Sequence, residues 1–288
     1  MEQVADRFWR PTGVFGWKSL GQRCANQACS AKYPMLNGLL RANDGVQMLG
    51  RWYCKGRCFE EAILEKFQRS ISTGPRPRTE FRHRMPLGLL MVSRGLIQHE
   101  QVKAALDLQA ETGERVGRCL QRIAGITEAE VAAMVGLQWS CPVYRGSVHP
   151  ECFRSIPKQL LGRYGMLPVH YVSASRHLYV GFRDRIDHTV LCAVEQMLAC
   201  HTAPCILEEQ VLESALASIA DTEERDLVLD NAPTPQEMAR IAGSYAQQLR
   251  AVEVRLVNTK EYVWVRVLGP RHMANLLFQR KDPNHTIQ

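Results

Sequence analysis

The 288-residue sequence has no long apolar run. No stretch approaches the roughly 18 consecutive apolar residues that a membrane-spanning helix needs. Residues 1–18 are interrupted by Asp6, Arg7, Arg10 and Lys18, so they lack the continuous apolar segment of a secretory signal peptide. These absences predict a protein without a membrane span that works in the cytoplasm.

Several short motifs that mark common enzyme classes are also missing. There is no Gly-Lys-Ser or Gly-Lys-Thr, which a phosphate-cradling nucleotide loop requires, and no GxGxxG, GxSxG or HExxH pattern. The nine histidines are scattered, and none stands in a catalytic arrangement with a cysteine. The sequence therefore favours a non-catalytic protein.

The composition is that of an ordinary folded chain, with 45% hydrophobic and 23% charged residues. This balance excludes wholesale disorder, and the length favours two or three small domains over one large one. The net charge of +7 is unevenly placed: residues 1–85 carry 15 Lys and Arg against 7 Asp and Glu, whereas the rest carries 21 against 22. A basic first third fits either contact with an anionic partner or a solvated basic linker.

Ten cysteines in a chain without an export signal do not predict disulfides. Six of them stand singly among apolar residues and are most simply small buried hydrophobes: Cys119, Cys141, Cys152, Cys192, Cys200 and Cys205. The remaining four form two close pairs.

These pairs are Cys24/Cys29 and Cys54/Cys58, separated by 24 residues. Two close thiolate pairs can converge on one tetrahedral zinc ion, each pair supplying two corners. Gly56 allows a tight turn inside the second pair, and a helical pattern follows in residues 59–67. We expect a bound zinc ion, because a segment of about 60 residues can hardly build an adequate apolar core without such a cross-link. Its role should be structural, because protein ligands fill all four positions. Four unrelated buried cysteines are the alternative.

Residues 86–138 contain an internal duplication. Residues 86–109 and 115–138 are two 24-residue copies, separated by five residues. Both copies have glycine at position 3, apolar residues at positions 6, 12, 17 and 21, and glutamine at position 24. Each copy predicts a helix, a turn at Gly95 or at Ala124-Gly125, and a second helix, with Thr127 and Glu130 forming a capping box. Two helical hairpins make a small bundle.

This duplication resembles the N-terminal domain of the ATPases of type II secretion and type IV pilus systems, of the GspE and MshE type. That family carries a tandem 24-residue motif that begins Arg-Leu-Gly, has a central Gly-Leu-Ile and ends in Gln, with five residues between its copies. The resemblance continues into residues 141–219, where residues 156–169 look like the family's second N-terminal subdomain. It covers about residues 86–219, and no nucleotide-hydrolysing domain follows, which implies the regulatory part of such an ATPase without its motor.

In the family, this domain can bind cyclic di-GMP, with each motif contributing to one half of the dinucleotide. Carried over residue by residue, the resemblance implies ligand contacts by Arg84, Leu87, Gly88, Leu96, Gln109, Arg115, Val116, Gly117 and Gln138. An arginine beside a glycine turn can pair with phosphate or stack on guanine. Copy one departs from the pattern, since Pro86 replaces the arginine, and Arg82 or Arg84 would have to reach in from upstream. Copy two has Ala124-Gly125-Ile126 for Gly-Leu-Ile, so a degenerate repeat kept for packing is the alternative.

The predicted fold class is a multidomain α+β protein, made of a zinc knuckle, a helical-hairpin repeat bundle, a small α+β subdomain and a closing helix with a two-stranded ribbon. In the subdomain we expect strands at 167–173, 176–183 and 204–208 and helices from Pro157, at 190–200 and at 210–219. The closing unit has a helix at 236–249 and strands at 252–258 and 262–268, with Trp264 on its buried face. The boundaries are 1–70, linker 71–85, 86–140, 141–220, linker 221–235, and 236–288.

The function predicted from these features is that of a non-catalytic bacterial regulatory or adaptor protein that binds cyclic di-GMP. Its contacts with a protein partner of secretion or pilus type are either ligand-responsive or constitutive. The alternative is a zinc-dependent regulator that grips nucleic acid with its basic first third. The two differ in DNA retardation at low salt, which the alternative requires.

Overall fold

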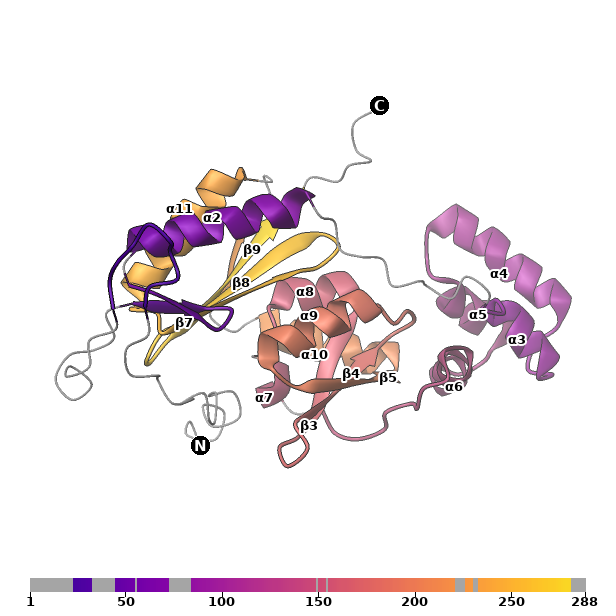
Figure 1. The fold of residues 1–288 in the computed structure, drawn as a ribbon. Coiled ribbons are helices and arrows are strands. Elements are labelled where there is room, and N and C mark those ends of the chain that lie inside the picture. The colour runs from indigo at the N-terminus through magenta and orange to yellow at the C-terminus, as the bar shows by residue number, and fades with distance from the viewer. Residues whose placement is uncertain are drawn as a thin grey trace. The chain divides into compact units, whose positions relative to one another are not determined.

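A computed structural model describes the chain over residues 23–32, 45–54, 56–72, 84–148, 150–153, 155–220, 226–229 and 233–280. It divides into two compact units, which we treat separately (Figure 1). The first unit comprises residues 1–77, 189–199 and 223–288, and the second comprises residues 78–188 and 200–222. Both helices and sheets are present, which confirms the α+β class. Across the described ranges, no helix is long and apolar enough to span a membrane.

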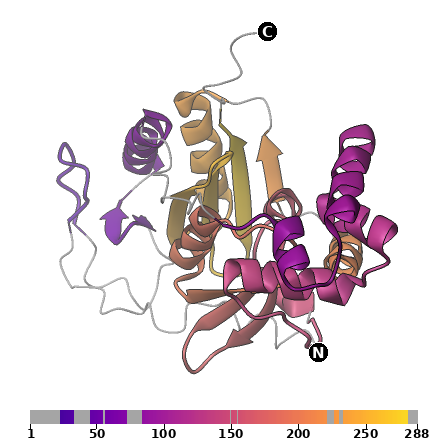
Figure 2. The same cartoon turned by 90° about the vertical axis from the view of Figure 1, so that its right-hand side faces the viewer.

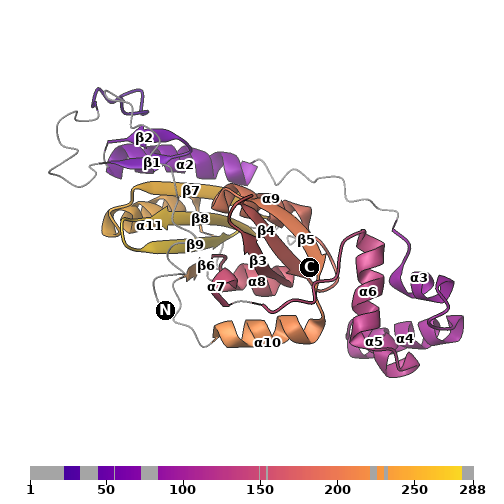
Figure 3. The same ribbon diagram turned by 90° about the horizontal axis from the view of Figure 1, so that it is seen from below.

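The first unit is built on a six-stranded sheet with the order β2-β1-β7-β8-β9-β6. Strands β7, β8 and β9 form an antiparallel meander, whose side-by-side strands are clear in Figure 3. β1 joins β7 in parallel and β6 joins β9 in parallel. The strands are β1 (Val46–Met48), β2 (Arg51–Tyr53), β6 (Asp226–Leu229), β7 (Glu253–Asn258), β8 (Tyr262–Leu268) and β9 (Met273–Gln279).

Two helices, α2 (Gly56–Ser72) and α11 (Pro235–Gln248), pack against each other and share an apolar core with this sheet. Alternate residues of β8 point into this core, as the period of two in a strand requires. Phe67 of α2 meets Phe278 of β9 edge to face, with ring centroids 5.6 Å apart. The fully buried members of this core include Met48, Phe59, Ile63, Val254, Val263, Val265 and Leu276. Trp264, the next residue of β8, is fully buried as expected, but it lies on the face of the sheet opposite this core.

The first unit differs in three ways from the sequence-based boundaries. Segments 1–70 and 236–288 were expected as separate domains, but β1 pairs with β7, with Gln47 opposite Glu253, so both belong to one sheet. The closing ribbon gains β9 as a third strand, and β6 lies within the expected linker 221–235. A two-stranded ribbon is marginal by itself, so the extra strands supply the missing partners. Of the linker 71–85, residues 73–83 lie outside the described residues.

Helix α9 (His188–Leu198) was expected in the α+β subdomain, but residues 189–199 group with the first unit. Arg255 of β7 donates a hydrogen bond from Nη1 to the carbonyl oxygen of Met197, at 2.7 Å. The buried residues of α9 lie on one broad face, and such a face shows that the helix packs without showing which sheet it packs on.

The second unit contains a three-stranded sheet and seven helices among its described residues. In the sheet β3 (Met166–Val172) runs antiparallel to β4 (His177–Phe182), and β4 runs parallel to β5 (His201–Ile206). Helices α7 (Pro150–Phe153) and α8 (Lys158–Tyr164) precede β3, and α10 (Glu209–Ala220) follows β5. The strand and helix positions expected for 156–219 are met to within a few residues.

The other four helices are the two predicted hairpins, seen together in Figure 2. They are α3 (Leu87–Ser93), α4 (His99–Thr112), α5 (Val116–Ala124) and α6 (Glu128–Trp139). Besides the contacts within each hairpin, α4 packs on α5 and α3 packs on α6. Their shared core is Met91, Ile97, Ala105, Cys119 and Leu120, with the partly buried Leu87, Leu96, Val102, Val116 and Val131 around it.

Candidate functional site

The two cysteine pairs meet at one point of the first unit. A short loop carries Cys24 and Cys29, and it is closed by a hydrogen bond from the Cys24 amide to the Ala31 carbonyl at 2.8 Å. The Ala25 amide donates to the carbonyl of Trp52 in β2, also at 2.8 Å, which fixes the loop beside the strand. Cys54 follows β2 directly, and Cys58 lies in the first turn of α2. Loop, strand and helix thus bring all four thiols together, as predicted.

The spacing of the four sulfur atoms fits a tetrahedral metal site. They all lie within 4.8 Å of one another, with Cys29 and Cys54 at 3.4 Å and Cys54 and Cys58 at 4.0 Å. Zinc–sulfur bonds of about 2.3 Å give tetrahedron edges of about 3.8 Å. A hydrogen bond with the backbone of Ala31 lowers the pKa of Cys29, whereas burial raises the pKa of Cys54 to about 12. These residues can hold a metal ion, whose charge would favour the thiolate form of all four.

In the second unit, the two repeat copies match contact for contact. Position 3 is a helical glycine in both copies, and it faces the valine at position 17. A Cβ on Gly88 would lie 2.7 Å from Val102 Cγ1, and one on Gly117 would lie 3.1 Å from Val131 Cγ1. The glycine is therefore what allows the two helices of each hairpin to approach closely.

The glutamine at position 24 makes a reciprocal exchange between the copies. Gln109 ends copy one, and its Nε2 donates to the carbonyl of Glu114, just before copy two, at 3.2 Å. Gln138 ends copy two, and its Nε2 donates to the carbonyl of Met85, just before copy one, at 2.8 Å. Each copy thus holds the start of the other, which explains the recurring glutamine.

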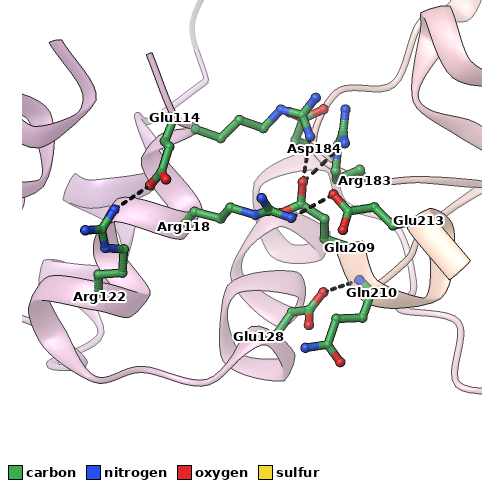
Figure 4. A network of polar contacts seen from close by, with 10 residues as sticks. Glu114, Arg118, Arg122, Glu128, Arg183, Asp184, Glu209, Gln210 and Glu213 are labelled. Atoms are coloured by element: carbon green, nitrogen blue, oxygen red, sulfur yellow. Dashed lines mark hydrogen bonds and ion pairs between the residues drawn. The ribbon is translucent and has the colours of Figure 1, made fainter. Parts of the chain in front are cut away.

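A network of ion pairs joins copy two to the start of α10 (Figure 4). Glu209 accepts from Arg115 Nη1 at 2.9 Å, from Arg118 Nε at 3.0 Å and from Arg183 Nη1 at 3.2 Å. Arg115 also lies 3.5 Å from Asp184, and Arg118 lies 2.7 Å from Glu213. The side chain of Glu209 is 15% exposed, so its three pairs are shielded from water more than typical surface pairs. Attraction to Glu209 raises the pKa of Arg118.

A small cavity of about 80 Å³ opens beside this network. Its apolar lining includes Leu87, Val116, Val131, Val135 and Leu207, and its charged lining includes Arg115, Arg118, Glu128, Arg183 and Glu209. Arg183 Nε is buried there without a hydrogen-bond partner. Asp184 and Glu208 line the cavity too, so three guanidinium groups and four carboxylates meet an apolar wall there.

Four of the nine predicted ligand residues line the cavity, and the other five do not. Leu87, Arg115, Val116 and Gly117 line the cavity. Gly88 and Leu96 belong to the packing of the hairpins, and Gln109 and Gln138 bind backbone carbonyls. Arg84 places its guanidinium over the Trp139 ring, 3.3 Å from the centroid, at the far end of α6. Ligand binding by all nine stays a prediction.

The partners of Arg115 carry no signal that would identify them from the sequence. Arg118 could have been singled out, because it is charged at position 4, where copy one has Leu89. Glu209 lies 94 residues from Arg115, and no local pattern marks it. It is brought there because α10 begins at this residue, directly after β5.

No protein-family model matches the chain, and no curated protein matches it. Among solved structures, the structure of MshE with cdg aligns at 24% identity and a TM-score of 0.39, over 47% of this chain and 99% of that one. The N-terminal domain of XpsE aligns at 14% identity and a TM-score of 0.34, over 46% of this chain and 91% of that one. A second crystal form of that domain aligns at 17% identity with a TM-score of 0.28.

Proposed function

We propose that the chain is a non-catalytic regulatory or adaptor protein of the bacterial cytoplasm whose repeat bundle binds cyclic di-GMP. The observation that supports this most is the duplication itself. It repeats the same glycine–valine approach and the same glutamine exchange, and Arg115, the motif arginine of copy two, lines a cavity next to it. The partner is a protein of secretion or pilus type, and nucleic acid is the alternative partner.

In this proposal different residues contact the phosphate and the base of the dinucleotide. Arg115 pairs with a phosphate of the dinucleotide through its planar fork of donors. Val116 and Leu87 offer apolar contact to a guanine face, and Gly117 keeps the backbone open to close approach. Gln109 and Gln138 position the two motif starts, while Arg84, Gly88 and Leu96 support copy one.

Isothermal titration of the full chain with cyclic di-GMP tests the proposal. We expect binding at tens of micromolar ligand or below, and a loss of about tenfold or more in Arg115→Ala, because a hydrogen bond to a charged group contributes about 1.5–3 kcal/mol. Arg122→Ala is the matched control, since Arg122 pairs with Glu114 and does not line the cavity. Absence of heat with the wild-type chain, or unchanged affinity in Arg115→Ala, contradicts the proposal.

We also propose that the four cysteines hold one structural zinc ion. With four protein ligands the ion has no position for water, so its contribution is to join the Cys24–Cys29 loop to β2 and α2. Metal analysis of the purified chain should give one zinc per molecule. Cys54→Ser should lose the metal and lower the melting temperature, whereas Cys141→Ser, outside the cluster, should keep it. A metal-free wild-type chain with unchanged stability in chelator contradicts this assignment.

A further inference from the structure

Glu209 is the point on which three guanidinium groups converge. Arg115 directly precedes α5, Arg118 lies in the first turn of α5, and Arg183 directly follows β4. All three donate to the two oxygens of this one carboxylate, at 2.9, 3.0 and 3.2 Å. Asp184 and Glu213 pair with Arg115 and Arg118 as well, but only Glu209 is shared by all three arginines. Arg183 Nε is buried there without a hydrogen-bond partner, so one donor at this point is still unsatisfied.

We infer that Glu209 is an internal competitor of the anionic ligand, occupying with its carboxylate the place that a ligand phosphate takes. This inference rests on the proposed function and deepens it. A carboxylate and a phosphodiester each present two oxygens to the fork of an arginine, so one can replace the other on the same donors. The cavity is much smaller than typical ligand pockets of several hundred Å³, so it admits one such group rather than a whole dinucleotide.

The exchange has a mechanical consequence because Glu209 is the first residue of α10. The start of this helix is tied to copy two by three sets of contacts. These are the Glu209 pairs, the pair of Glu213 with Arg118 at 2.7 Å, and the amide of Gln210, which donates to Glu128 of α6 at 2.8 Å. A phosphate that takes Arg115 and Arg118 also takes the latter from Glu213, and it leaves the Glu209 carboxylate with Arg183 alone. A partly buried carboxylate that loses two of its three partners is costly, so the start of α10 leaves copy two and its surface becomes available.

Carboxylate-to-amide variants test this competition, because they keep the shape of the side chain and remove its charge. Titration with cyclic di-GMP should give about tenfold tighter binding in Glu209→Gln, because the competitor is weakened. Asp184→Asn, which frees Arg115 from a longer contact of 3.5 Å, should give a smaller gain. Glu114→Gln is the control, because Glu114 pairs with Arg122, outside the Glu209 cluster. Circular dichroism confirms that each variant is folded.

The outcomes separate the inference from the proposed function. If the wild-type chain binds cyclic di-GMP and neither Glu209→Gln nor Asp184→Asn changes the affinity, the inference is overturned and the function stands. If no variant binds, both fall. Hydrogen exchange gives an independent readout: amides of residues 209–214 should exchange faster when ligand is bound. Unchanged or slower exchange there, with ligand bound, overturns the release of α10.

Discussion

The two copies of the repeat have the same residues at the main packing positions, but they differ in the charge of their outward-facing residues. Positions that touch the partner helix, such as the glycine at 3 and the glutamine at 24, are the same in both. Positions that face outward differ: copy two has Arg115, Arg118 and Glu128 where copy one has Pro86, Leu89 and His99. All three charged residues of copy two contact the start of α10.

This difference shows how a duplicated element can gain a second task. The packing positions must stay, because each copy needs the other to bury its apolar face and to hold its first residue. The outer positions are free to diverge, since surface substitutions cost little stability. Copy two has become a charged docking face, while copy one exposes 45% of Leu89.

The largest expected effect concerns the glycine at position 3. Gly88→Ala should destabilise the bundle by about 2 kcal/mol, because its new methyl group meets the stiff, β-branched Val102 at 2.7 Å. Gly117→Ala should be nearly neutral, because the contact is 3.1 Å and alanine favours the helix. Urea unfolding followed by circular dichroism measures both. Equal losses would contradict the unequal clearances of 2.7 and 3.1 Å on which the prediction rests.

A second test restores the motif arginine of copy one. Pro86→Arg places a guanidinium at the position that Arg115 occupies in copy two, and Pro86 is exposed, so the fold should tolerate it. We expect cyclic di-GMP to bind about tenfold tighter, the gain from one charge-assisted contact. Pro86→Gln, uncharged, is the control. Tighter binding in both variants would point to loss of the proline rather than gain of charge.

The reciprocal glutamines should behave as a pair. Gln138→Ala removes the donor to the Met85 carbonyl and should cost about 1 kcal/mol. Gln109→Ala, whose bond to the Glu114 carbonyl is longer, should cost somewhat less. Thermal unfolding measures each loss. An effect confined to one glutamine would break the pseudo-symmetry inferred from the two bonds.

The smallest effect is expected at the helix starts, and it depends on pH. Hydrogen bonds from Thr127 lower the pKa of Glu130 in the cap of α6, whereas the corresponding cap of α4 uses the neutral Gln101. A lowered pKa means that this carboxylate stabilises the fold above its usual pKa and loses that contribution as the pH falls through the folded value. The stability difference between wild type and Glu130→Gln should therefore shrink below pH 4.5. A difference that is constant with pH contradicts this.

Local patterns predicted much of the second unit. The duplication gave the four helices of the bundle, and Thr127 with Glu130 makes the predicted capping box. The cysteine pairs were brought together as their spacing indicated. These features depend on residues close in sequence, where turn chemistry and helical period leave few alternatives.

The remaining features depend on pairings between distant residues. No property of residues 46–48 indicates that they lie beside residues 253–258, because a short apolar strand can join any compatible edge. The sequence does not mark Glu209 as the partner of the three arginines either, since a glutamate at a helix start is common. The sequence does not show which sheet α9 packs on either, because its apolar face fits any apolar sheet surface.

The parallel pairing of β1 with β7 has a consequence for how the protein is made. About 200 residues separate these strands, so a ribosome adding 5–20 residues per second completes β7 on the order of ten to forty seconds after β1 emerges. Throughout that interval Met48, Phe59 and Phe67 lack the strands that later cover them. A metal ion bound early by the four thiols would stabilise this segment until β7, β8 and β9 are synthesised. Otherwise a chaperone would have to cover the exposed apolar residues.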